Sequence, residues 1–345
     1  RYVGMSDADQ ATAWLKMNKA KNITEWEDAL KMQQIGSLNF VYADKEDNIL
    51  FVHNMKSPKR SNDYDWKNIL PGDASNLIWN DYYSYDEIPK ILNPKSGYIY
   101  STNQSPFFVT EIDDNLNEED FPVTMGFQSR ITNRAHRAFE LLDNDKNISW
   151  DKLDEYKQDN KYSFNSRQYK FLQKIFKFDF KDDARLETAQ KFLQNWNLGT
   201  DSENLQAAFG VCILGPEWLA EIKREPQPDP IKIFKDCIVE FEVNFNRLDI
   251  KWSEVSFLER GNKILPVQGG PDVLRAIYSP RSENGILKAV AGDGLYAYVS
   301  WDKLGKQQSF SIHQFGSSST VEDSPHYHDQ MELFVNEELK ETFFN

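Results

Sequence analysis

The chain has 345 residues, of which 40% are hydrophobic and 14% aromatic, and its formal net charge is −14. This composition excludes an intrinsically disordered chain, because it supplies enough apolar surface to bury a core. No apolar run approaches the roughly 20 residues of a membrane-spanning helix, so no membrane span is predicted. The negative charge also excludes a typical nucleic-acid-binding protein, since it would repel phosphates.

The first elements predicted along the chain are two helices and a hairpin. Residues 8–18 and 24–34 carry apolar side chains at helical spacing. Residues 37–54 then read SLNFVYADKEDNILFVHN, in which two β-branched and aromatic runs flank a polar turn at 45–48. This pattern is typical of an antiparallel β-hairpin.

The remainder alternates loop, helix and strand in long blocks. Residues 54–96 are rich in Pro, Asp and Asn and predict a long ordered loop, and 97–108 predict a strand that runs into a loop at Asn103. A helical block is predicted over about 130–250, followed by strands and loops over 252–345. Strand-rich parts on both sides of a helical block indicate an α+β protein, most simply a single domain.

The two cysteines, Cys212 and Cys237, form no metal or redox motif. Either they pair in one disulfide outside the cytosol, or each is a buried thiol; the sequence leaves both open.

No metal site is predicted, although two patterns resemble one. Residues 143–155 (DNDKNISWDKLDE) place oxygen-bearing side chains at alternate positions, as a calcium loop does. The glycine needed for the sharp turn is Ile148 here, so an inter-helix turn with Ser149 capping the next helix is favoured. His326 and His328 lack a third ligand, which favours surface or structural roles. A structural calcium ion remains open.

No dinucleotide, P-loop, zincin or α/β-hydrolase motif is present, so pattern alone identifies no catalytic site. A resemblance does. Several stretches, in the same order along the chain, resemble the penicillin acylase family: 14–30, 37–54, 92–108 (LNPKSGYIYSTNQSPFF) and 129–142 (SRITNRAHRAFELL). Three later stretches, 248–255, 265–276 and 316–334, are similar to its acyl-homoserine lactone and aculeacin acylase subgroup.

The resemblance implies an N-terminal nucleophile hydrolase, with part of a four-layer αββα sandwich and a helical excursion. It places residues 1–345 in the carboxy-terminal portion of the large subunit. In this family an amino-terminal serine attacks an amide carbonyl, with its own α-amine as the base. The resemblance gives Asn103 as an oxyanion donor and Arg130 as a residue that orients the active site.

Trp14 and Leu38 match acyl-pocket positions of the family, with ordinary core packing as the equal alternative. Residue 1 is Arg, which cannot act as the nucleophile. The resemblance therefore implies another chain of the same processed precursor that carries the serine.

The expected activity is hydrolysis of small N-acyl amides, such as acyl-homoserine lactones, to a carboxylic acid and an amine. The alternatives are β-lactam side-chain cleavage and a non-catalytic scaffold. The resemblance implies a bacterial periplasmic or secreted enzyme that needs no cofactor.

Overall fold

The computed structural model describes residues 3–4 and 8–343, so Arg1, on which the prediction of a separate nucleophile chain partly rests, lies outside the described residues. The chain divides into two compact units, residues 1–135 and 136–345. The division falls in the first turn of helix α3 (Asn133–Asp143). Each unit is described by itself.

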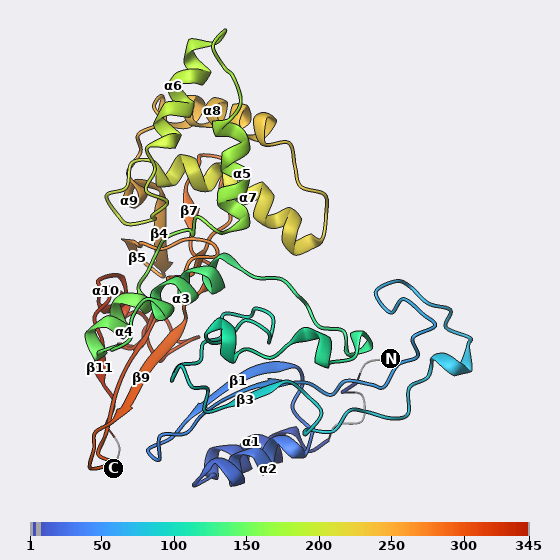
Figure 1. Ribbon diagram of the computed structural model, residues 1–345. Helices are drawn as coiled ribbons and strands as arrows, with labels where there is room; N and C mark the ends of the chain where they lie inside the picture. The colour runs from blue at the N-terminus through green and yellow to red at the C-terminus, as the bar shows by residue number, and fades with distance from the viewer. Residues whose placement is uncertain (1–2, 5–7, 344–345) are drawn as a thin grey trace. The chain divides into compact units, whose positions relative to one another are not determined.

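The first unit begins with the predicted helices and hairpin. Its elements are α1 (Gln10–Lys19), α2 (Ile23–Lys31), β1 (Leu38–Ala43), β2 (Ile49–Asn54) and β3 (Lys90–Leu92), with 3₁₀ helices at Ser75–Leu77, Ile112–Asp114, Glu118–Asp120 and Val123–Met125. The three strands form one antiparallel sheet in the order β1-β2-β3. The helices α1 and α2 lie along one face of this sheet (Figure 1).

Side-chain alternation in the hairpin explains this packing. Leu50 and Val52 of β2 are buried in the cluster that also holds Ala13 and Met17 of α1 and Leu30 of α2. The intervening Phe51 is buried on the opposite face in a separate small cluster. Because both faces of β2 are covered, the predicted hairpin forms the centre of the unit.

The predicted strand at 97–108 is wrong: these residues form no strand. Side chains replace the ladder of a sheet there. The Gln104 amide nitrogen donates to the Phe108 carbonyl (2.8 Å), and the Thr110 hydroxyl donates to the Tyr98 carbonyl (2.8 Å). Just beyond the predicted strand, the Asn115 amide oxygen accepts hydrogen bonds from the backbone N–H groups of Val109 (2.8 Å) and Thr110 (3.3 Å). Local polar side chains therefore offer the backbone other partners than a neighbouring strand.

The second unit contains the predicted helical block and the strands that follow it. Its helices are α4 (Trp150–Lys157), α5 (Arg167–Phe176), α6 (Ala184–Gln194), α7 (Ala207–Lys223), α8 (Pro230–Phe245), α9 (Trp252–Val255) and α10 (Met331–Val335). Its strands are β4 (Ser256–Arg260), β5 (Lys263–Pro266), β6 (Ile277–Tyr278), β7 (Leu287–Lys288), β8 (Ala291–Gly292), β9 (Leu295–Trp301), β10 (Gln307–His313) and β11 (Lys340–Glu341). The sheets have the orders β5-β4-β7, β11-β10-β9 and β6-β8, and β4 and β7 are parallel.

The turn between α3 and α4 forms as predicted. Ser149 caps α4 by accepting the N–H of Lys152. Asp145 accepts the N–H of Asn147 (2.9 Å) and the hydroxyl of Tyr156 (2.7 Å). The carboxylate of Asp145 thus fastens the turn, and within the described residues no group of three or more His, Cys, Asp or Glu side chains is arranged to hold a metal ion.

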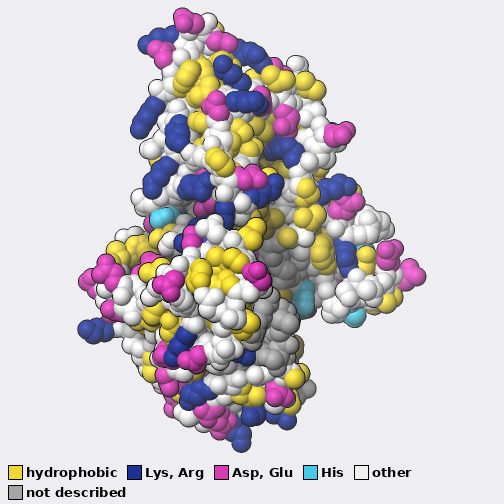
Figure 2. Space-filling view, turned by 90° about the vertical axis from the view of Figure 1, so that its right-hand side faces the viewer, with side chains coloured by type: hydrophobic (Ala, Val, Ile, Leu, Met, Phe, Trp, Pro, Cys, Tyr) yellow, Lys and Arg dark blue, Asp and Glu magenta, His cyan; other side chains and the backbone are white. Residues whose placement is uncertain are grey.

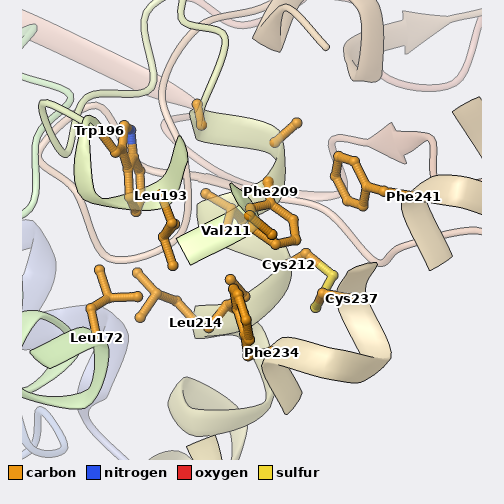
Figure 3. Packing of buried hydrophobic residues seen from close by; sticks show 14 of the residues in the cluster. Leu172, Leu193, Trp196, Phe209, Val211, Cys212, Leu214, Phe234, Cys237 and Phe241 are labelled. Atoms are coloured by element: carbon orange, nitrogen blue, oxygen red, sulfur yellow. A yellow bond between two sulfur atoms is a disulfide. The ribbon is translucent and has the colours of Figure 1, made fainter. Parts of the chain in front are cut away.

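Helix α7 is the centre of the second unit. It is apolar on nearly all sides and is buried from Ala207 to Leu214. Cys212 of α7 and Cys237 of α8 form a disulfide with a Cα–Cα distance of 6.2 Å. Figure 3 shows this bond beside the aromatic rings of Phe234 and Phe209. The structure therefore decides between the two states that the sequence left open.

Removing the disulfide is expected to destabilise the second unit. The bridge closes a loop with a sequence separation of 25 residues, for which the chain-entropy estimate is about 3 kcal/mol. We expect the Cys212→Ala/Cys237→Ala variant to lose about that much free energy of unfolding in urea, measured by tryptophan fluorescence. Dithiothreitol should then destabilise the natural protein and leave the variant unchanged. Equal sensitivity of both proteins to the reductant would contradict this expectation.

No helix among the described residues is long and apolar enough to cross a bilayer. Basic and acidic side chains are interspersed on the face shown in Figure 2, so the excess negative charge does not gather in one patch there.

Candidate active site

The loop at 100–108 presents Asn103 at its tip. Gln104 is buried, and its amide oxygen accepts the backbone N–H (2.6 Å) and the hydroxyl (2.9 Å) of Thr102. Its amide nitrogen donates to the carbonyl of Phe108 (2.8 Å). Gln104 thus fastens the loop from inside, while Asn103 is exposed and has a left-handed backbone with φ of +70°. Asparagine tolerates this conformation better than most residues with a Cβ.

The Asn103 side chain has a defined orientation. The Arg134 guanidinium donates from Nη2 to Oδ1 of Asn103 over 3.2 Å. Arginine has donors only, so the amide oxygen must face it and the amide NH₂ group must point away. The exposed loop tip therefore offers two N–H donors. Such a group can stabilise an oxyanion that forms beside it.

Arg130 lies next to this loop through its backbone. Its carbonyl accepts the N–H of Ser105 over 3.3 Å, and its side chain is exposed. Two residues on, the Thr132 hydroxyl lies 3.3 Å from that of Thr102. Since the Thr102 hydroxyl donates to Gln104, Thr132 is the donor in this pair. The two segments that carry Asn103 and Arg130 are thus joined through Ser105 and Thr132.

A second series of hydrogen bonds joins the hairpin of β1 and β2 to the start of the loop. Nδ1 of His53 lies 2.6 Å from Oδ1 of Asn39, and Nδ2 of Asn39 donates to the Ser101 hydroxyl over 3.2 Å. The assigned Asn39 orientation places the His53 proton on Nδ1. Burial lowers the pKa of His53 from 6.5 to about 4, so the ring is neutral at pH 7.

This pKa predicts a pH dependence of stability. Between pH 6.5 and about 4 the unfolded chain binds a proton at His53 that the folded chain does not, so stability falls as the pH falls through this window. The contribution is at most about 3.5 kcal/mol. In urea unfolding at pH 7.5 and pH 4.5, His53→Gln should therefore lose less stability between the two pH values than the natural protein. Parallel losses would mean that His53 is accessible to protons in the folded state.

Trp14 and Leu38 lie on the helix-covered side of the hairpin. The Trp14 ring is half-buried, 5.7 Å from the ring of Phe40 between their centroids. Leu38 precedes Phe40 by two positions on β1, so it shares that face, and it is 49% exposed. Asn39, between them, faces Ser101 and hence the loop of Asn103. Leu38 therefore lies on the helix-covered face of β1, and Asn39 on the other.

The model of the penicillin amidase family matches residues 1–345. The chain belongs to this family. The penicillin amidase family consists of amide hydrolases of the N-terminal nucleophile type.

Two relatives illustrate the relationship. Penicillin G acylase of Escherichia coli is 36% identical over 94 residues, which are 27% of this chain and 11% of that protein. The match therefore spans a small part of the relative's length. The solved structure of a thermostable penicillin G acylase from Alcaligenes faecalis superposes with a TM-score of 0.61 at 16% identity, covering 98% of this chain and 70% of that one. This likeness supports the mixed α+β fold of the penicillin amidase family for the chain.

Two residues of the site were missed from the sequence. Arg134 stands four positions after Arg130 in the segment RITNR, in the first turn of α3, and Gln104 directly follows Asn103. No spacing rule relates Arg134 to Asn103, because Arg130 precedes the helix. Nothing in the sequence around Gln104 distinguishes a buried glutamine that holds the loop by hydrogen bonds from an exposed turn residue.

Proposed function

We propose that this chain is a component of an acylase that hydrolyses N-acyl amides to a carboxylic acid and an amine. Asn103 supplies an N–H donor to the tetrahedral oxyanion, and Arg130 helps to orient the amino-terminal group of the nucleophile. The observation that carries this proposal is the amide of Asn103, exposed at a loop tip and held by Arg134 with its donors outward. Membership of the penicillin amidase family supports the reaction class.

Another chain of the same precursor supplies the nucleophilic serine and completes the four-layer αββα sandwich. The sheet of the first unit supports this part of the proposal. Strand β1 is an edge strand among the described residues, and Leu38 and Val41 on its two faces are each 49% exposed. An apolar edge strand invites pairing with further strands, and residues 1–345 then form the carboxy-terminal portion of the large subunit.

The substrate is a small molecule with an apolar acyl group. The resemblance of the last ninety residues favours acyl-homoserine lactones, whereas the two relatives named above favour penicillin G. We place the enzyme in the periplasm or outside the cell, which the disulfide between Cys212 and Cys237 supports. Trp14 and Leu38 contact the acyl group. The enzyme requires no cofactor, and a calcium ion has at most a structural role.

The test is to purify the enzyme with all the chains that accompany this one and to assign their amino termini. A co-purifying chain that begins with serine is expected. The preparation should also release a carboxylic acid from at least one substrate of a panel that contains decanoyl-homoserine lactone and penicillin G, with the free amine products as negative controls. The preferred substrate of the panel decides between the two classes. An intact preparation that contains the serine chain and cleaves no member of the panel would leave the scaffold alternative standing and overturn the proposal.

Arg134 is a positioning residue in this proposal. Without its guanidinium the Asn103 amide rotates freely, so Arg134→Ala should lower kcat about tenfold, the scale of one charge-assisted hydrogen bond, with little change in KM. Arg134→Lys keeps one donor and should recover part of the loss. The decisive measurement is the Asn103→Ala/Arg134→Ala double variant, which should be no slower than Asn103→Ala alone. Additive losses would mean that Arg134 acts independently of Asn103.

A further inference from the structure

The second unit contains a cavity of about 620 Å³ between helices α7 and α8 and the segment 271–290. This volume lies within the range of small-molecule sites, about 300–1,000 Å³. Most of its wall is apolar and includes Val211, Leu219, Ile233, Pro271, Leu287 and Val290. The cavity is built entirely from residues of the second unit, outside the candidate active site of the first.

The cavity is held open by the sequence of α7. Gly215 and Pro216 follow one another within this helix, although both residues disfavour a helix interior. A Cβ atom at Gly215 would have no neighbour within 4 Å, and both residues line the cavity. The missing side chain at 215 therefore leaves space that an ordinary helical residue would occupy.

The walls of the cavity are also fixed relative to one another. The disulfide between Cys212 and Cys237 joins α7 to α8 (Figure 3). Both cysteines also line the cavity. On another side, the rings of Trp218 and Tyr278 are stacked with centroids 5.3 Å apart. A site that is fixed before binding loses little conformational entropy when a ligand enters.

The charged side chains of the cavity wall favour one sign of ligand charge. Arg281 donates to Oε1 of Glu240 over 3.0 Å, and both side chains are at least two-thirds buried. Oε2 of Glu240 lies 3.6 Å from the sulfur of Cys212, which in a disulfide has no proton to donate. Asp236 adds a second carboxylate to the lining, and its Oδ2 accepts a hydrogen bond from Lys232 over 2.6 Å. Arg281 and Lys232 thus each pair with one of the two carboxylates, and Oε2 of Glu240 remains as an acceptor that faces the disulfide instead of a cation.

We propose that this cavity binds an apolar amine, with its aliphatic or aromatic body among the apolar side chains and its ammonium group at Glu240. The ammonium donates to Oε2 of Glu240, and the stacked rings of Trp218 and Tyr278 offer a favourable surface for a cation. A carboxylate of the same shape would lie beside Glu240 and Asp236 and is disfavoured. This site does not depend on the amidase proposal.

The experiment uses N-phenyl-1-naphthylamine, whose fluorescence rises in apolar sites, and two competitors with the same chain, n-octylammonium and octanoate. At pH 7.5 the ammonium should displace the probe with a Kd at least tenfold lower than that of octanoate. Gly215→Leu fills the cavity and should weaken probe binding at least tenfold, whereas Gly215→Ala should stay within twofold. Glu240→Gln should abolish the preference for the ammonium. Circular dichroism verifies that each variant is folded.

A surface variant keeps the test decisive if Gly215→Leu does not fold. Leu219 lines the cavity and is 46% exposed, so Leu219→Lys is expected to fold and to weaken n-octylammonium at least fivefold while it strengthens octanoate. The control is Leu295→Lys, a change on β9 at a side chain that is 59% exposed and does not line the cavity. Absence of probe binding, equal affinity for the two competitors, or equal effects of the two lysine variants would each overturn the proposal.

Discussion

Asn103→Ala in the assembled, serine-bearing enzyme is expected to lower kcat for amide hydrolysis by about 10²–10³ with a much smaller change in KM. The factor is that of removing one oxyanion donor, which acts on the transition state more than on the bound substrate. The measurement is steady-state kinetics on the best substrate of the panel.

Asn103→Gly is the matched control for this prediction. Asn103 has a φ of +70°, a conformation that strains alanine by about 1 kcal/mol and suits glycine. If the lost donor causes the effect, Ala and Gly at this position should be equally slow. Activity regained in Asn103→Gly would assign the loss to backbone strain, and full activity in Asn103→Ala would refute the oxyanion role.

Arg167→Met is expected to cost about 3–5 kcal/mol of free energy of unfolding, because it leaves a charge buried without its counterion. The carboxylate of Glu217 on α7 is fully buried and accepts a hydrogen bond from Nε of Arg167 at the start of α5. Gln227 also donates to its Oε1 (3.1 Å), whereas its Oε2 has no hydrogen-bond partner in the described part of the chain. The arginine therefore supplies the only charge compensation that Glu217 receives within about 4 Å in these residues.

The triple variant Arg167→Met/Glu217→Leu/Glu221→Gln separates charge from packing. The Arg167 guanidinium also lies 3.4 Å from Glu221, whose side chain is 11% exposed, so all three charges are removed together. This variant should unfold within about 1 kcal/mol of the natural protein in urea. Arg185→Met provides the surface comparison, because it breaks a pair with Glu242 in which both side chains are about half exposed. That change should cost less than about 1 kcal/mol. A triple variant as unstable as Arg167→Met would show that the arginine acts through its packing.

The local elements were largely predictable because their signals are short-range. The hairpin 37–54 has β-branched runs on either side of a polar turn, and it appears as β1 and β2 with the turn between them. Asn22 and Ser149 cap their helices in positions that their types favour. The strand predicted at 97–108 is absent, and the side chains of Gln104 and Thr110 take the backbone carbonyls of Phe108 and Tyr98, which a neighbouring strand would otherwise pair.

The site could be predicted only in part. Asn103 and Arg130 were predicted from the resemblance of their segments to the family. In the structure, hydrogen bonds made by Ser105 and Thr132 join the two segments. The contact between Arg134 and Asn103 joins residues 31 positions apart, and it depends on the rotamer of a long side chain. No spacing rule in a single sequence specifies such a rotamer.

The sequence by itself determined the α+β class, the helical block, the absence of an intact catalytic motif and the family resemblance, because composition, periodicity and ordered segments are properties of the chain. Only the tertiary structure decided the pairing of Cys212 with Cys237, the outward amide of Asn103 and the open space beside Gly215. Each of these features depends on the distance in space between residues that are far apart in the sequence. That distance is fixed by the packing of whole elements, which no local pattern encodes.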